Sequence, residues 1–174
     1  MAKMVFSLQT LNAHKLNKEI YSTNESQDSE LMESIKTNGL IQIPQVMKDG
    51  TILSGHRRIK ALMALGHKEW ELDVVDPEDQ EVFLIEANRT RNKTITDLKR
   101  EIDFLRSHHE VRAKLRQARL EPAVGSTYAT IGKTLGMSST QVFKVDKVLE
   151  AAKSNPAAAG SVSKIEKGES SVNA

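Results

Sequence analysis

The first half of the chain alternates short patterns typical of helices with short patterns typical of strands. In "SELMESIKTNG", Leu31 and Ile35 recur at helical spacing, and Gly39 follows where a glycine often ends a helix. "IPQVM" and "TILS" have the aliphatic content of strands, and the Asp-Gly pair between them predicts a hairpin. These residues predict an α+β arrangement of short elements.

The same alternation continues to about residue 95. The stretch "GTILSGHRRIKALMALG", residues 50–66, passes from a strand directly into a helix that places Ile59, Leu62 and Met63 on one apolar face. "WELDVV" alternates as a half-buried strand does. In "DPEDQEVFLIEAN", Asp76 is placed as an N-cap and Pro77 as the first residue of another helix.

From residue 96 onward the pattern is helical. "TDLKREIDFLRSHHEVRAKLRQARLEP" predicts one long helix, broken at Pro122, with apolar positions at Leu98, Ile102, Leu105, Val111 and Leu115. "TYATIGKTLG" and "SSTQVFKVDKVLEAA" predict two shorter helices. We therefore expect a first domain over 1–95, an all-helical region over 96–153, and a loosely ordered or truncated tail over 154–174.

Composition is typical of a globular cytoplasmic protein. The 174 residues are 39% hydrophobic and 28% charged, and they contain no cysteine, which excludes disulfides and cysteine zinc sites. No apolar run is long enough to span a membrane, so we expect no membrane partner. Residues 1–95 carry 12 Lys and Arg against 14 Asp and Glu, whereas residues 96–174 carry 13 against 9. This asymmetry favours a polyanion partner for the second half.

The junction of strand and helix at residues 54–58 has the chemistry of an anion site. A helix N-terminus presents unpaired backbone N–H groups and the positive end of its dipole. Ser54 and Gly55 permit close approach of a ligand, and Ser54 can cap the helix. Arg57 and Arg58 supply planar guanidinium donors suited to phosphate. Two solvated arginines without a ligand are an equally open interpretation.

A second polar cluster, "LIEANRTRNKT", follows at the end of the next helix. Asn88 could hold a metal ion or a phosphate-bound water, and Arg89 and Arg91 could reach the same anion. A helix C-cap also favours asparagine and basic residues, and the cluster by itself is more typical of such a cap.

Taken together and in this order, three motifs resemble the N-terminal domain of the ParB partition proteins, in the ParB/sulfiredoxin superfamily. "ESIKTNGLIQIPQV" is similar to the family's Ser-Ile-x-x-x-Gly-aliphatic-x-x-Pro segment, "DGTILSGHRRIKALMALG" to its Gly-Glu-Arg-Arg box, and "LIEANRTRNKT" to its Glu-Asn-x-x-Arg box. The match runs from about Ile20 to Lys99, and the preceding "LNKEIYS" favours a plasmid- or phage-borne type. The resemblance implies a ParB/sulfiredoxin-like α+β domain followed by a helix-turn-helix region.

The resemblance also implies a nucleoside triphosphate ligand, CTP in the partition proteins, held with Mg²⁺ at Asn88. The nucleotide-binding residues that it implies are Gly39, Gln42, Ser54, Gly55, His56, Arg57, Arg58, Asn88, Arg89 and Arg91. His56 and Ala87 stand where the family motifs have glutamates, which reduces the means to orient an attacking water. The residues therefore favour nucleotide binding over hydrolysis, and NTPase activity stays open.

"YATIGKTLGMSSTQVFKVDKVL" fits a helix-turn-helix. Gly132 is small where the helices would cross, Gly136 would make the turn, and Val142 and Val145 would face the core. The expected DNA contacts are Ser138, Ser139, Thr140, Gln141 and Lys144 on the second helix, with Arg112, Arg116 and Arg119 on the long helix. A generic helical hairpin shows the same pattern, but the ParB-like motifs before it favour DNA binding.

The sequence thus predicts a ParB-like protein that binds double-stranded DNA under the control of a nucleoside triphosphate, in plasmid or phage DNA partition, maintenance or regulation. The chain lacks the further helices and dimerisation domain of the partition proteins, so we expect a fragment or a reduced member, and a homodimer stays open. Two alternatives remain. One is a Mg²⁺-dependent DNA nuclease, which the scarcity of acidic residues in the clusters disfavours. The other is a plain helix-turn-helix transcriptional regulator.

Overall fold

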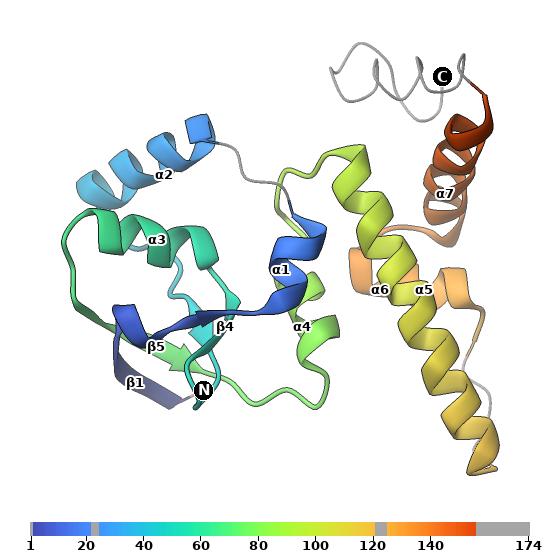
Figure 1. Cartoon of the computed structure of the whole chain (residues 1–174), viewed down its shortest axis with the longest axis horizontal. Helices are drawn as coiled ribbons and strands as arrows, with labels where there is room; N and C mark the ends of the chain where they lie inside the picture. The colour runs from blue at the N-terminus through green and yellow to red at the C-terminus, as the bar shows by residue number, and fades with distance from the viewer. Residues whose placement is uncertain (1, 22–24, 121–124, 156–174) are drawn as a thin grey trace. The chain divides into compact units, whose positions relative to one another are not determined.

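The computed structural model describes residues 2–21, 25–120 and 125–155, which belong to two compact units, Met1–Asn88 and Arg89–Ala174 (Figure 1). Unit 1 contains a mixed sheet with helices, and the described part of unit 2 is helical. The α+β class expected from the sequence is confirmed. The division falls after Asn88, whereas the sequence pattern placed it near residue 95. None of the helices in these ranges is long and apolar enough to cross a membrane.

A sheet with the order β1-β5-β3-β4-β2 forms the centre of unit 1. Its strands are β1 (Ala2–Ser7), β2 (Asn12–Ala13), β3 (Gln45–Val46), β4 (Thr51–Ser54) and β5 (Glu69–Val74). β3 and β4 pair antiparallel in the predicted hairpin, where the Gly50 N–H donates to the Met47 carbonyl at 3.0 Å. β1 pairs antiparallel along β5. Its first four residues are all exposed, so no alternation of apolar and polar residues marks it as a strand in the sequence.

Helices cover this sheet and close the core of unit 1. They are α1 (Lys15–Ile20), α2 (Glu25–Asn38), α3 (His56–Ala64) and α4 (Gln80–Ala87), with a 3₁₀ turn at Leu8–Thr10. α2 lies beside α3 in Figure 1, and the predicted apolar positions Ile35, Ile59 and Leu62 are buried between these helices and the strands. Their removal from water is the main force that holds the two helices on the sheet. The expectation that Met63 shares this buried face is wrong, because this residue is 44% exposed.

α4 begins later than the sequence predicted. Asp79 is its N-cap, and the Asp79 carboxylate accepts the Val82 N–H at 3.1 Å. The expectation that Asp76 caps this helix and that Pro77 begins it is wrong. The Val75 N–H still donates to the Val46 carbonyl at 2.9 Å, so the chain leaves the sheet only after this residue. Asp76 is therefore too close to the strand to cap the helix.

Unit 2 contains α5 (Ile95–Ala118), α6 (Thr127–Leu135) and α7 (Ser139–Ser154) in its described part. α5 begins with a capping box in which Thr94 and Asp97 satisfy each other's backbone N–H groups. Ile102 and Leu105 are fully buried, as the pattern predicted. Residues that pack α6 against α7 are Ile131, Leu135, Val142 and Val145, all buried. The predicted break at Pro122 and the tail beyond residue 155 lie outside the described residues.

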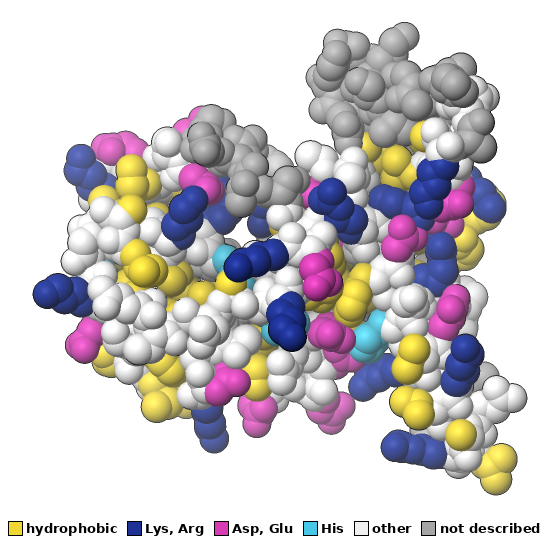
Figure 2. Space-filling model, in the orientation of Figure 1, with side chains coloured by type: hydrophobic (Ala, Val, Ile, Leu, Met, Phe, Trp, Pro, Cys, Tyr) yellow, Lys and Arg dark blue, Asp and Glu magenta, His cyan; other side chains and the backbone are white. Residues whose placement is uncertain are grey.

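The second half of α5 does not follow the predicted apolar stripe. Val111 and Leu115 have 57% and 52% of their surface exposed. Figure 2 shows hydrophobic and basic side chains together at this end of the helix. The arginines expected to contact DNA from α5, Arg112 and Arg119, are also exposed, and Arg116 is half-buried. This part of α5 is therefore a solvent-facing surface of mixed apolar and basic character.

Candidate functional site

The junction between β4 and α3 is built around a glycine. Gly55 is the N-cap of α3 and has a left-handed backbone, with φ of 87°. A Cβ at this position would lie 2.9 Å from the Cβ of Pro44, so only glycine fits without displacement. Ser54 stays in the β-ladder opposite Gln45, and no side chain caps the helix. The expectation that Ser54 caps α3 is therefore wrong.

Arg58 connects this junction to the loop that follows α2. Its Nη1 donates to the main-chain carbonyl of Gln42 at 2.7 Å. Burial lowers the pKa of Arg58 below its usual value, yet a guanidinium stays charged at any physiological pH. The loop begins at Gly39, which has φ of 71° and ends α2. The structure thus brings the Gly39–Pro44 segment, Gly55 and Arg58 together.

Arg57 lies against α2. Its Nε donates to Oδ1 of Asp28, and Lys60 Nζ lies 3.5 Å from Oδ2 of the same carboxylate. Burial raises the pKa of Asp28, but the hydrogen bonds and charges of Arg57 and Lys60 outweigh it and hold this pKa below its usual value. Sequence reasoning did not single out Asp28, because it belongs to a polar run in which nothing distinguishes it.

An open groove of about 350 Å³ runs between α2 and α3 at this ion pair. Its lining combines charged and apolar side chains from both helices, namely Asp28, Ser29, Met32, Arg57, Lys60, Ala61 and Ala64. Two cations face one carboxylate here, so the groove has an excess of positive charge. Such a surface suits a ligand that carries an anionic group.

The polar cluster "LIEANRTRNKT" is divided between the two units, because unit 1 ends at Asn88. Asn88 is the C-cap of α4, and its Nδ2 donates to the Leu84 carbonyl at 2.9 Å. Its Oδ1 is therefore the atom that could coordinate a metal ion or accept a hydrogen bond from a water molecule. Arg89 begins unit 2 and donates to carbonyls at the end of α6. Arg91 is half-buried in the segment before α5, and His56 is half-buried as the first residue of α3.

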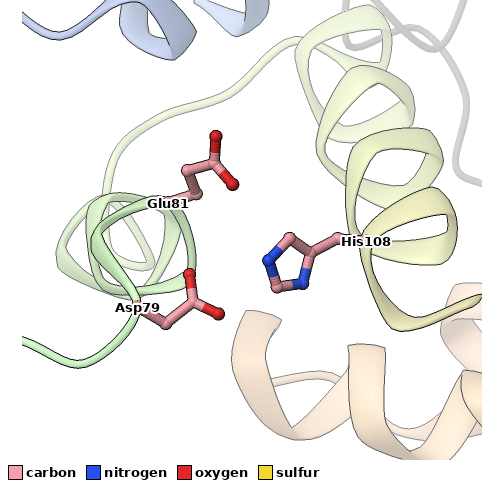
Figure 3. Close-up of side chains that lie close together, drawn as sticks. All are labelled: Asp79, Glu81 and His108. Atoms are coloured by element: carbon pink, nitrogen blue, oxygen red, sulfur yellow. The ribbon is translucent and has the colours of Figure 1, made fainter. Parts of the chain in front are cut away.

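Figure 3 draws Asp79, Glu81 and His108, three side chains for which the sequence predicts no metal site. Asp79 and Glu81 belong to unit 1 and His108 belongs to unit 2, and each is accounted for within its own unit. Asp79 caps α4, and Glu81 is in the first turn of that helix, where an acid complements the helix dipole. His108 stacks on Phe104 of the same helix, with ring centroids 5.7 Å apart.

The expected DNA contacts of α7 are all exposed at its N-terminal half, and two of them also cap the helix. Ser138 Oγ accepts the Gln141 N–H at 3.2 Å, and Gln141 Oε1 accepts the Ser138 N–H at 2.9 Å. This capping box uses the oxygen of Gln141. Ser139, Thr140 and Lys144 are exposed beyond it. The Ser-x-x-Gln spacing of residues 138–141 is the sequence signature of this capping box, beside the base-reading chemistry expected of Gln141.

A buried ionic cluster connects α5, α6 and α7, and no sequence pattern indicates it. Asp146 of α7 lies 3.0 Å from Lys99 Nζ and 2.6 Å from Arg106 Nη2, and it accepts the Tyr128 hydroxyl at 2.9 Å. Burial raises the pKa of Asp146, but these partners outweigh it and lower the pKa to about 2. The same hydrogen bond raises the pKa of Tyr128.

No family model matches the chain, and no curated protein matches it in sequence. Solved structures do match. A pNOB8-like ParB N-domain aligns with 99% of this chain and 76% of its own length, at 14% identity and a TM-score of 0.65. A further pNOB8-like ParB N-domain structure aligns with 83% of this chain and 63% of its own length, at 16% identity and a TM-score of 0.59.

A third match is the C-terminally truncated chromosome-partitioning protein ParB from Caulobacter crescentus, in a complex with the centromeric parS site. It aligns with 98% of this chain and 95% of its own length, at 16% identity and a TM-score of 0.54. At these identities the likeness concerns the fold. The chain therefore has the fold of the ParB N-domains.

Proposed function

We propose that this chain is a ParB-like DNA-binding protein whose affinity for DNA is controlled by a nucleoside triphosphate of the CTP type, bound with Mg²⁺ at the start of α3. It would function in plasmid or phage DNA partition, maintenance or regulation. The observation that carries the proposal is the junction at Gly55. There a helix N-terminus without a side-chain cap meets the Gly39–Pro44 loop and the half-buried guanidinium of Arg58.

The junction supplies three elements that a triphosphate needs. The first turn of α3 contains no acidic residue of its own, so no carboxylate within that turn neutralises the positive end of the helix dipole. Arg58 is oriented by the Gln42 carbonyl, which reduces the entropy lost when it binds a phosphate oxygen. Arg57 is the neighbouring residue and carries a second guanidinium. To bind the ligand, this guanidinium would exchange its ion pair with Asp28 for a contact with a phosphate.

Asn88 would contribute to the Mg²⁺ ion through Oδ1, since Nδ2 is used by the Leu84 carbonyl. Mg²⁺ binds protein through few side-chain oxygens and takes its other ligands from phosphates and water. A single amide oxygen therefore fits a metal that arrives with the triphosphate. The ion would neutralise phosphate charge, and the residues of this chain would orient the phosphates.

The described part of unit 2 supports the DNA half of the proposal. α6 and α7 are two short helices joined by a tight turn, and a Cβ on Gly132 would lie 2.5 Å from the Met137 carbonyl oxygen. Ser139, Thr140 and Lys144 are exposed at the start of α7, the end of a recognition helix that contacts bases. Lys144 would contact a phosphate, so Lys144→Ala should weaken binding to all sequences and reduce the salt slope by about 1.

Calorimetric titration of the full chain with CTP, ATP and GTP, each with Mg²⁺ and with or without DNA, tests the proposal. We expect saturable binding of at least one triphosphate, and Arg58→Ala should lower its affinity by about tenfold or more. Lys36→Ala is the matched control, because Lys36 is an exposed cation of α2 that pairs with Glu33. It removes the same charge and should leave the affinity unchanged.

Other outcomes would point elsewhere. DNA binding without a response to any triphosphate would contradict the proposal and favour a plain transcriptional regulator. Cutting of plasmid DNA in Mg²⁺ that Asn88→Ala abolishes would favour a nuclease. Equal loss of nucleotide affinity in Arg58→Ala and Lys36→Ala would show that only net charge matters.

A further inference from the structure

The Arg89 side chain caps the C-terminal end of α6. Its Nη2 donates to the Lys133 carbonyl at 2.9 Å and to the Thr134 carbonyl at 3.2 Å, and its Nε donates to the Thr134 carbonyl at 3.2 Å. The last carbonyls of a helix have no partner within the helix, and they form the negative end of its dipole. A guanidinium that donates to two of them satisfies both the hydrogen bonds and the charge.

The contact continues onto the turn between α6 and α7. Gly136 ends α6 in a left-handed conformation with φ of 71°. A Cβ on Gly136 would lie 2.8 Å from Cδ of Arg89, so the absence of a side chain makes room for the arginine stem. Beyond the glycine, the Met137 N–H donates to the Gly132 carbonyl at 2.8 Å and returns the chain toward α7. Arg89 thus packs on the turn and also caps the helix before it.

We infer that Arg89 is a positioning residue that fixes the turn between α6 and α7 and couples the Asn88–Arg91 segment to the start of α7. The coupling rests on the proposed function, which places Asn88 at the Mg²⁺ of the nucleotide and DNA reading on α7, and on the expectation from the ParB-like motif that Arg91 contacts the nucleotide. Arg89 lies between these two residues in the chain, and its guanidinium is anchored 44 and 45 residues away. A nucleotide that fixes the backbone on either side of Arg89 therefore also restrains the turn.

This role differs from the nucleotide contact expected from the sequence. Nε and Nη2 of Arg89 are committed to main-chain carbonyls, and a bidentate phosphate contact would need donors from the same fork. Such coupling requires that the turn between α6 and α7 has two conformations and that the nucleotide favours one of them. The experiment therefore measures the turn directly as well as the two binding reactions.

Arg89→Ala, Arg89→Lys and Arg91→Ala in the full chain form the test set. Without ligand, amide hydrogen exchange at Met137 should be about tenfold faster in Arg89→Ala and unchanged in Arg91→Ala. Arg89→Lys keeps the charge but loses the fork, so its exchange rate should lie between those of the wild type and Arg89→Ala. This readout needs neither nucleotide nor DNA.

The binding arm uses CTP with Mg²⁺ and a DNA duplex. Arg89→Ala should keep its nucleotide affinity within about twofold of the wild type, and it should lose the effect of nucleotide on DNA affinity. Unchanged exchange at Met137, or a loss of nucleotide affinity equal to that of Arg91→Ala, would overturn the inference. If the wild type binds no triphosphate, the proposed function fails, while the exchange result still decides whether Arg89 fixes the turn.

Discussion

Lys99 on α5 and Asp146 on α7 form a buried ion pair, with 3.0 Å between Nζ and Oδ1 and only 8% and 3% of their residue surfaces exposed. Each charge would be costly to bury alone, so the two residues depend on each other. Arg106 and Tyr128 bind the second oxygen of the carboxylate and complete its hydrogen bonds. One carboxylate thus links α5, α6 and α7, in addition to the apolar residues that these helices bury.

Removal of one partner should therefore destabilise unit 2 strongly. Lys99→Met removes one of the two cations that compensate the buried charge of Asp146 and leaves Arg106 in place, and we expect a loss of about 2 kcal/mol in the free energy of unfolding. Urea denaturation followed by circular dichroism measures it. Lys153→Met is the control, because Lys153 pairs with Glu150 on the surface, at 3.0 Å and 66% exposure, and should cost less than about 0.5 kcal/mol. Equal losses would contradict a special role for the buried pair.

Unit 2 should also lose stability in acid. The folded state holds the pKa of Asp146 at about 2, below the ordinary value of 3.8, so folding favours the ionised form. This contribution is complete above about pH 4 and is lost as the pH falls toward about 2, and it amounts to about 2 kcal/mol. Urea midpoints measured across this range should fall in the wild type. Asp146→Asn should reduce that slope, and an unchanged slope would exclude Asp146 as its source.

Asp28→Asn should raise the affinity for a triphosphate. Arg57 is held by Asp28 in the absence of ligand, and the neutral amide should release it at lower cost. We expect a gain of about threefold to tenfold in nucleotide affinity, measured by calorimetry. Glu33→Gln on the same helix removes an exposed charge that pairs only with Lys36 among the ion pairs described, and it should change the affinity little. A lower affinity in Asp28→Asn would mean that the carboxylate orients Arg57 for the ligand.

Gly55→Ala and Gly66→Ala separate backbone strain from crowding. Both glycines have φ of 87°, but a Cβ at Gly55 meets Pro44, whereas a Cβ at Gly66 has no atom within 4 Å. Gly66→Ala should cost about 1 kcal/mol from the left-handed backbone alone. Gly55→Ala should cost about 1–3 kcal/mol more, because Pro44 must move. Thermal unfolding of both variants gives the difference in stability. Equal losses of stability would show that the loop carrying Pro44 moves at no cost in free energy.

The elements that the sequence predicted well are those with local signals. Gly39 and Gly136 both end helices in left-handed conformations, as glycine after an apolar pattern indicated. The hairpin around Gly50 and the buried positions of α6 and α7 also followed from short patterns. β1 was missed because an edge strand with four exposed residues carries no alternation.

The contacts that the sequence could not predict join distant residues. Lys99 and Asp146 are 47 positions apart, and Arg57 and Asp28 are 29 apart, so no local period connects them. The arginine-rich motif predicts Arg89 as a phosphate ligand, but no local pattern indicates that its side chain donates to carbonyls of a helix that begins far along the chain. Side-chain chemistry indicated what these residues can bind, and only the fold determined which partner each one reaches.

The contact between Arg58 and Gln42 has a consequence for variation at the loop. Arg58 is held by a peptide oxygen, which every amino acid provides. Residue 42 is therefore free to diversify without loosening the arginine, whereas a deletion or insertion between Gly39 and Pro44 would carry that oxygen away. Libraries that retune ligand preference can randomise the side chain at 42, provided that the length of the segment is preserved.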